Sequence, residues 1–147
     1  MDAIEKTIVG TWSYVEQDDM EPFLNAIEAP DFDKNAMMSS RPRLTFAVEG
    51  DKIVFTNTPN PTTDPSSVIS YKCGLGEEIT IGITQNVKMR FEWKDGKLVQ
   101  HMHPTTMKKG TIEYSLNDKS QLLKVYKYSP ENGGSDVTAT IKFEKAK

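Results

Sequence analysis

The sequence predicts a mainly β protein in which about ten short antiparallel strands follow one another as a meander. Runs of alternating apolar and polar residues, each closed by turn residues, fill most of the 147-residue chain. Two turns, at residues 49–51 and 94–96, place Gly and Asp between alternating runs, which is the usual hairpin signal. Helical periodicity is found only in residues 18–40, so we expect one helical insertion after the first strand.

The strand-like runs follow one another at short intervals along the chain. From the N-terminus they are TIVGTWSYV, RLTFAVEGDKIVFTN, SVISYKCG, EITIGIT, NVKMRFEWKDGKLVQHMH, GTIEYSL, LLKVYKYS and VTATIKFEK. In the last run, every second side chain from Val137 to Phe143 is apolar and the side chains between them are polar. One face of each strand should therefore be dry and the other wet. Ten such strands form a closed or nearly closed sheet, whose interior is large enough for one small apolar ligand.

Residues 18–40 are expected to form two short helices. Met20, Phe23, Leu24 and Ile27 follow the i, i+3, i+4, i+7 spacing of one face of an amphipathic helix. A proline ends this helix, and a second short helix can follow before the chain returns to a strand. The apolar stripe of the first helix must cover apolar surface elsewhere in the chain.

Composition and charge exclude several classes of protein. Hydrophobic residues make up 37% of the chain, and no run reaches the roughly 18 apolar residues that a membrane helix needs. A formal net charge of −3 gives no general attraction for nucleic acid. Cys73 is the only cysteine, which excludes an internal disulfide, and the first ten residues lack the layout of a secretory signal. We therefore expect a single domain over residues 1–147, monomeric and cytoplasmic, without nucleic-acid partners.

Several short motifs follow one another along the chain: GTW at 10–12, the helical stripe, EGD at 49–51, ISYKCG at 69–74 and DGKLVQ at 95–100. Their order and spacing resemble the intracellular fatty-acid-binding protein family of the calycin superfamily, which includes the cellular retinoid carriers. The resemblance covers nearly the whole chain, with longer loops near residues 59–65 and 129–136. It implies a ten-stranded, up-and-down β-barrel, or β-clam, with a two-helix lid over the cavity entrance, and a carrier that needs neither catalysis nor a cofactor.

The resemblance also locates a departure from the family pattern. Members that carry fatty acids usually hold the carboxylate with an Arg-x-Tyr pair on the last strand, together with an Arg on an earlier strand. The matching positions on the last strand are Ile141 and Phe143, and the earlier position falls on Glu113 or, with a one-residue gap, on Tyr114. No inward cation is then expected, and an unpaired carboxylate would cost several kcal/mol to bury. Neutral lipids, or an atypical pose of a fatty acid, are therefore favoured.

The expected function is an intracellular carrier of a long-chain fatty acid or neutral lipid, held in the barrel and exchanged during transient contact with membrane surfaces. The alternative is a non-carrier structural or interaction protein on the same fold, with a filled or unused cavity. Ligand uptake is expected through the lid, where Lys34, Arg41 and Arg43 could meet anionic lipids. The residues expected to contact the ligand are Met20, Phe23, Leu24, Met37, Ile83, Met89, Phe91, Met102, Tyr114, Ile141 and Phe143.

Two other features of the sequence resemble possible sites. His101 and His103 share one strand face but fall short of the three or four ligands of a zinc site, so we interpret them as surface residues. Cys73 follows the inward register of Ile69 and Tyr71, which favours a small core residue over a nucleophile. No carboxylate pair, phosphate loop or catalytic triad stands out, so neither a metal, a cofactor nor an enzymatic activity is expected.

Overall fold

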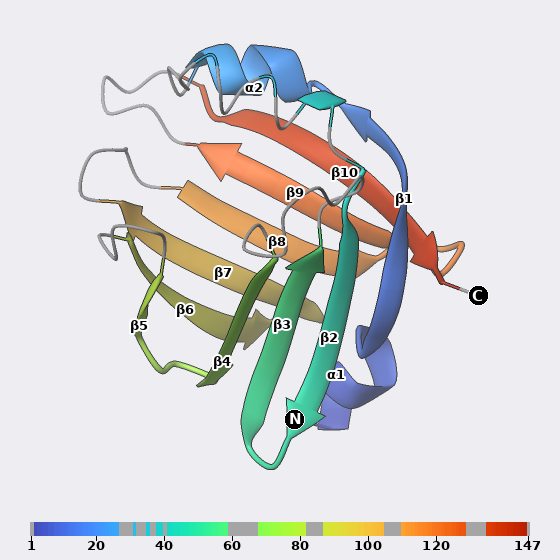
Figure 1. Cartoon of the computed structure of the whole chain (residues 1–147), viewed down its shortest axis with the longest axis vertical. Coiled ribbons are helices and arrows are strands. Elements are labelled where there is room, and N and C mark those ends of the chain that lie inside the picture. Colours follow the sequence, from blue (N-terminus) through green and yellow to red (C-terminus); the bar gives the residue numbers. More distant parts are fainter. Residues whose placement is uncertain are drawn as a thin grey trace.

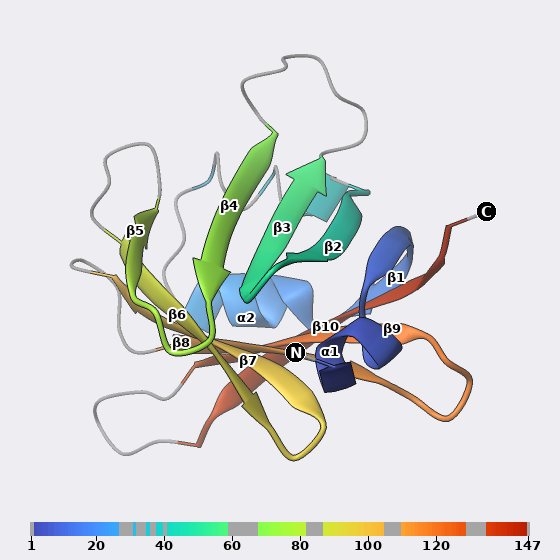
Figure 2. The same cartoon turned by 90° about the horizontal axis from the view of Figure 1, so that it is seen from below.

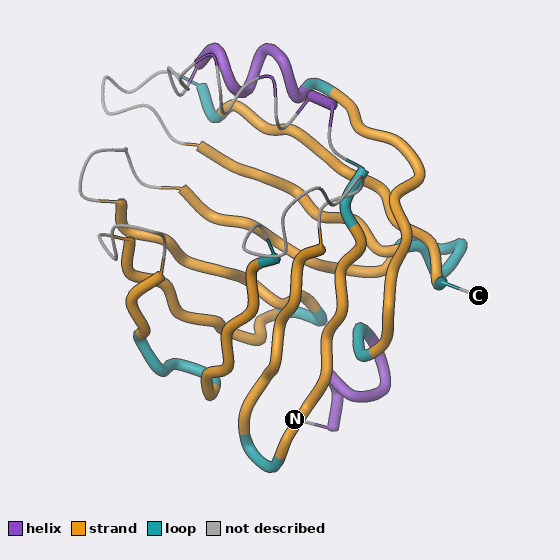
Figure 3. Tube along the Cα trace, viewed as in Figure 1, coloured by secondary structure: helices purple, strands orange, loops and turns teal. Residues whose placement is uncertain are grey.

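The computed structural model describes residues 2–26, 31, 35, 38–39, 41–58, 68–81, 87–104, 110–128 and 135–146. Strands make up most of this part of the chain, and helices lie at two ends of the molecule (Figure 3). The elements are α1 (Asp2–Thr7), β1 (Gly10–Asp18), α2 (Met20–Ala26), β2 (Arg43–Glu49), β3 (Lys52–Thr58), β4 (Ile69–Gly74), β5 (Ile79–Ile81), β6 (Val87–Lys94), β7 (Lys97–Pro104), β8 (Gly110–Leu116), β9 (Leu122–Tyr128) and β10 (Val137–Lys145).

All ten strands belong to one antiparallel sheet that curls into a nearly closed barrel (Figure 1). The order across the sheet is β4-β3-β2-β1-β10-β9-β8-β7-β6-β5, so the first strand pairs with the last. The two end strands, β4 and β5, are joined by a short turn at one end and diverge toward the other (Figure 2). Just after β4, the backbone N–H of Gly76 donates to the carbonyl of Phe91 in β6 at 2.8 Å. The predicted mainly β meander and its antiparallel barrel are confirmed.

Helix α2 lies over one end of the barrel, next to β10 (Figure 1). It begins after Asp19, whose carbonyl accepts the N–H of Phe23 at 3.1 Å, and its buried face consists of Met20, Phe23 and Leu24. A second helix follows before β2, and Met38 is among its described residues. The predicted insertion of two helices after the first strand is therefore confirmed. Ile27 lies outside the described residues.

Helix α1 is an element that the strand pattern did not predict. The run TIVGTWSYV was expected to be strand throughout, but the N–H of Ile8 donates to the carbonyl of Ile4 at 3.0 Å and β1 begins only at Gly10. Ile4 and Ile8 are both fully buried. α1 lies at the end of the barrel opposite α2 (Figure 1), so these side chains cover apolar surface at the closed end.

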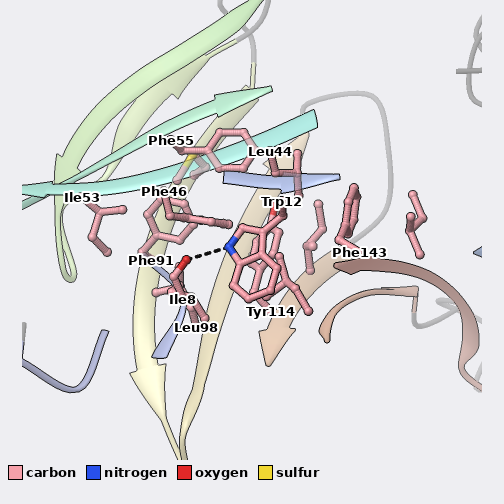
Figure 4. Close-up of a cluster of buried hydrophobic side chains, with 14 of the residues drawn as sticks. Ile8, Trp12, Leu44, Phe46, Ile53, Phe55, Phe91, Leu98, Tyr114 and Phe143 are labelled. Atoms are coloured by element: carbon pink, nitrogen blue, oxygen red, sulfur yellow. Dashed lines mark hydrogen bonds between the residues drawn. The ribbon is translucent and has the colours of Figure 1, made fainter. Parts of the chain in front are cut away.

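A cluster of large apolar side chains fills the barrel at the α1 end (Figure 4). The indole Nε1 of Trp12 donates to the carbonyl of Ile8 at 2.9 Å, which ties β1 to the turn after α1. The ring of Phe46 stands edge-on to the rings of Phe55 and Tyr114, with centroids 5.1 and 5.0 Å apart. Burial of each such side chain stabilises the fold by about 1.5–3 kcal/mol. This end of the barrel is a packed core.

Candidate functional site: the barrel interior

The inward face of the barrel contains most of the residues that the sequence predicted as ligand contacts. Met37 and Ile83 lie outside the described residues. The structure gathers the other nine into or against one buried apolar cluster, although a contact with ligand stays a prediction. Eight of the nine are buried, and Met102 is partly buried. The nine are Met20, Phe23, Leu24, Met89, Phe91, Met102, Tyr114, Ile141 and Phe143.

The choice between Glu113 and Tyr114 is settled by the register of β8. Tyr114 is fully buried, with its ring packed against Phe46 inside the barrel. Glu113 points to the outer face, where its carboxylate forms an ion pair with Lys127 of β9. On the last strand, Ile141 and Phe143 are buried in the inward cluster. The positions that match the Arg-x-Tyr pair are therefore inward and apolar.

The expectation that the interior has no cation is wrong, because Lys124 of β9 points into it. The side chain is only 7% exposed. In the sheet register, Lys124 stands directly opposite Tyr114 on one neighbouring strand and Ile141 on the other, so all three share the inward face. Among the described residues, Lys124 is the only buried charged side chain, and no carboxylate of that part of the chain forms an ion pair with it.

Aromatic rings surround the ammonium group of Lys124. The distance from Nζ to the ring centroid is 5.1 Å for Tyr126, 5.7 Å for Tyr114 and 6.0 Å for Phe55. These distances lie near the outer limit of about 6 Å for a cation–π interaction. The rings therefore contribute a modest attraction, and no described residue accepts a hydrogen bond from this buried ammonium group.

A chain of neutral polar groups crosses the interior beside Lys124. Gln100 of β7, which is buried, donates from Nε2 to Oη of Tyr71 at 2.9 Å and accepts at Oε1 from Oη of Tyr114 at 3.1 Å. Burial raises the pKa of both tyrosines well above the usual value of about 10. Both phenols therefore stay protonated at physiological pH. Because Tyr71 accepts from Gln100, its own O–H proton remains available to another acceptor.

The other two features weighed from the sequence fit structural roles. Cys73 is fully buried opposite Ile53, and burial raises the pKa of its thiol to about 11, so it is a core residue as predicted. Ile69, which was expected to share its inward environment, is instead 50% exposed near the start of β4. Nε2 of His101 lies 3.1 Å from a carboxylate oxygen of Glu92 on the outer face. The described residues contain no group of three or more side chains that could hold a metal ion.

A polar groove on the outer face does not resemble a site for an apolar ligand. Its volume is about 330 Å³, and it is separated from the interior by the sheet itself. Both acidic and basic side chains line it, and Val99 is the only apolar lining residue. The lining residues are Glu92, Lys94, Asp95, Lys97, Val99, His101 and Glu113.

No protein-family model and no curated protein sequence matches the chain. Solved structures do match, and the fold is that of the intracellular lipid-binding proteins. The fluorescent protein UnaG is 22% identical, with a TM-score of 0.78 over 97% of this chain and 99% of its own. Fatty-acid-binding protein 1 of Echinococcus granulosus is 15% identical, with a TM-score of 0.78 over 100% of both chains. The Schistosoma mansoni fatty acid binding protein, solved in complex with arachidonic acid, is 17% identical, with a TM-score of 0.78 over 95% of this chain and 96% of its own. At these identities the likeness establishes the fold alone.

None of the described helices has the length and hydrophobicity needed to span a membrane.

Proposed function

We propose that the protein is an intracellular, monomeric carrier that binds one long-chain lipid inside the barrel and has no catalytic activity. The observation that carries this proposal is the partial burial of two inward side chains, Met102 and Tyr126. At the α1 end, Trp12 and Leu98 are closely packed, whereas Met102 and Tyr126, nearer α2, face inward but are only partly buried. Partial burial of inward apolar side chains is expected where the interior has space or an opening. The fold is shared with a protein solved with arachidonic acid, which supports a lipid as the ligand.

The energetics allow such binding without an Arg-x-Tyr pair. Burial of a hydrocarbon tail contributes about 0.8 kcal/mol per methylene, so a tail of about fifteen methylenes contributes roughly 12 kcal/mol. A micromolar complex requires a net of about 8 kcal/mol, which leaves a margin against the lost freedom of the ligand. The apolar positions Ile141 and Phe143 then serve tail or core packing, and the head group has to be bound elsewhere.

The lid would control uptake and release of the ligand. The ring of Phe23 in α2 lies 5.6 Å from the ring of Tyr126 in β9, so the helix closes directly onto an inward-facing strand residue. Arg41, next to this region, stacks its guanidinium over the ring of Tyr14 at 4.8 Å and donates to the carbonyl of Met38 at 3.1 Å. Separation of α2 from β9 would open the barrel at this end. Lys34, the third base expected here, lies outside the described residues.

The first experiment tests the carrier function directly. Protein purified under native conditions is extracted and analysed for lipid, and the delipidated protein is titrated with an environment-sensitive apolar probe. We expect a co-purified lipid and saturable binding of about one probe per chain, with a monomeric mass by light scattering. Absence of both the lipid and saturable binding would leave the alternative, a filled barrel with a structural or interaction role.

A second experiment tests the proposed contact with membranes. Arg43→Glu changes an exposed base at the start of β2, and Lys97→Glu makes the same change of charge at the opposite end of the barrel. We expect Arg43→Glu to slow transfer of the probe to anionic vesicles more than Lys97→Glu does, because charge at the lid end would face the membrane. Affinity in solution should be unchanged in both variants. Equal slowing would mean that net charge, and not the lid surface, governs transfer.

A further inference from the structure

We propose that Lys124 is the head-group anchor of the barrel and that the ligand is a monocarboxylate amphiphile bound with its head inward. This inference rests on the proposed carrier function and names its ligand class. Lys124 is an almost fully buried ammonium group with no anionic partner among the described residues. A buried charge without a partner is costly, whereas the same charge paired with a desolvated carboxylate is a favourable, charge-assisted contact.

The groups around Lys124 favour an anion over a neutral head group. Burial keeps the phenols of Tyr71 and Tyr114 protonated, so these residues contribute neutral donors and no negative charge. The hydroxyl group of Tyr114 donates its hydrogen bond to Oε1 of Gln100. The hydroxyl group of Tyr71 accepts from Nε2 of Gln100, so its own proton can be donated to another acceptor. Among the described residues, neither the ammonium group of Lys124 nor the hydroxyl group of Tyr71 donates to an acceptor, so both donors are available to a ligand. A carboxylate accepts at two oxygens and donates nothing, which matches this set.

The single positive charge selects the head group by its charge. A lysine ammonium is a compact point charge, unlike the planar fork of arginine, and one lysine balances one negative charge. A carboxylate carries a charge of −1 at neutral pH and would be neutralised. A phosphate monoester carries about −1.5 to −2, so part of its charge would remain buried and unpaired. A quaternary or primary amine would be repelled.

The position of Lys124 along β9 determines the direction of the ligand. On the α1 side, Leu122 is fully buried opposite Phe143, so the packed core blocks this route. On the α2 side, Tyr126 is the next inward residue, only partly buried and in contact with Phe23 of the lid. A tail attached to a carboxylate at Lys124 would therefore extend past Tyr126 toward α2. The head is innermost and the end of the tail lies nearest the lid.

The test compares three ligands of equal chain length in two variants. Hexadecanoate, hexadecan-1-ol and hexadecylamine compete with a bound apolar probe, below their micelle concentrations, at pH 7.4. Lys124→Met removes the buried charge and keeps a similar length. Lys127→Met is the matched control, because it makes the same substitution on the outer face of the same strand, where Lys127 pairs with Glu113. Urea unfolding of each variant is measured first.

Wild-type protein should bind hexadecanoate most tightly and hexadecylamine most weakly. Lys124→Met should weaken hexadecanoate binding by about 10–100-fold, as expected for loss of a charged hydrogen bond, while hexadecan-1-ol binding changes less than threefold. Lys127→Met should change neither. A wild-type preference for the alcohol over the acid would overturn the proposal even if Lys124→Met did not fold. Equal loss of acid and alcohol in Lys124→Met would also overturn it, because a general packing role would then explain the residue. If wild-type protein binds none of the three ligands, it is the carrier function that fails.

Discussion

Introducing an arginine at Ile141 should destabilise the protein more than its burial alone requires, because the new cation would meet Lys124. Ile141 and Lys124 stand directly opposite each other on paired strands, and both face inward. Directly opposed side chains in an antiparallel pair have Cβ atoms about 4.5–5.5 Å apart. Ile141→Arg therefore places two positive charges side by side in an interior where the described residues supply no carboxylate.

The size of the effect follows from Coulomb's law. Two like charges about 6 Å apart, at an effective dielectric constant of about 20, repel by roughly 3 kcal/mol. This repulsion adds to the several kcal/mol that an unpaired buried arginine costs by itself. In the double variant Ile141→Arg with Lys124→Leu, the repulsion disappears, because the interior again contains one cation. We therefore expect a coupling free energy of about 2–3 kcal/mol, with the double variant more stable than the sum of the single effects.

Urea unfolding of the wild type, the two single variants and the double variant gives the four free energies of this cycle. Ile141→Gln serves as a control, since it introduces a polar side chain of similar size without charge and should show little coupling to Lys124→Leu. Effects that add within about 0.5 kcal/mol would refute the reasoning, because independent sites behave in that way. Additivity would mean that Lys124 does not direct its ammonium group toward Ile141 in solution.

Three further predictions concern the core and the outer face. Trp12→Phe removes the hydrogen bond to the carbonyl of Ile8, and the unsatisfied buried carbonyl should lower the free energy of unfolding in urea by about 1–3 kcal/mol. Cys73 should not react with a thiol-specific reagent at pH 8 in the native protein and should react on unfolding, because burial raises its pKa to about 11. The carboxyl of Glu77 accepts from the backbone N–H of Gly74, which lowers its pKa. This carboxylate contributes to the free energy of unfolding at pH values above about 4.3, the usual pKa of a glutamate, and the contribution is lost as the pH falls through the lowered pKa. Glu77→Gln should therefore make the free energy of unfolding less dependent on pH in the acid range.

The alternation of apolar and polar residues predicts the inward face of a strand correctly where one face of that strand is consistently apolar. In β10, the inward positions predicted from the sequence include Ala139, Ile141 and Phe143, and all three are buried. Both faces of this strand have a uniform character, so burial of the apolar face fixes the register, and a slip of one residue would expose every apolar side chain. The pairing of β10 with both β1 and β9 then follows from the closure of the sheet.

Helix α1 was missed because it is too short for periodicity to reveal it. It has six residues, of which only Ile4 is buried, so no i, i+3, i+4 pattern can repeat. The residues that follow, Ile8 and Val9, continue directly into β1 and resemble its start in composition. Burial of Ile4 and Ile8 against the closed end of the barrel stabilises this helix, and that contact depends on strands far away in the sequence.

Lys124 was missed because neither face of its strand is free of charge. In the run LLKVYKYS, one face carries Leu122, Lys124, Tyr126 and Tyr128, and the other carries Leu123, Val125 and Lys127. Whichever face turns inward, a lysine turns with it. The pattern therefore contained a signal that was not used, namely that the interior of this barrel would receive a cation from this strand.

The larger apolar surface decides which lysine is buried. Burial of Leu122 and the two tyrosines outweighs burial of Leu123 and Val125 by about one large side chain, or roughly 1.5–3 kcal/mol. The partner strands act in the same direction, because Tyr114 and Ile141 stand opposite Lys124 and are themselves buried. A lysine that no local rule would place inside is thus held there by its apolar neighbours, in a barrel whose last strand buries only the apolar side chains of Ala139, Ile141 and Phe143. Burial of the unpaired charge of Lys124 costs free energy, and an anionic ligand would remove that cost. The residue that the strand pattern predicts least well is therefore the one that we propose binds the ligand.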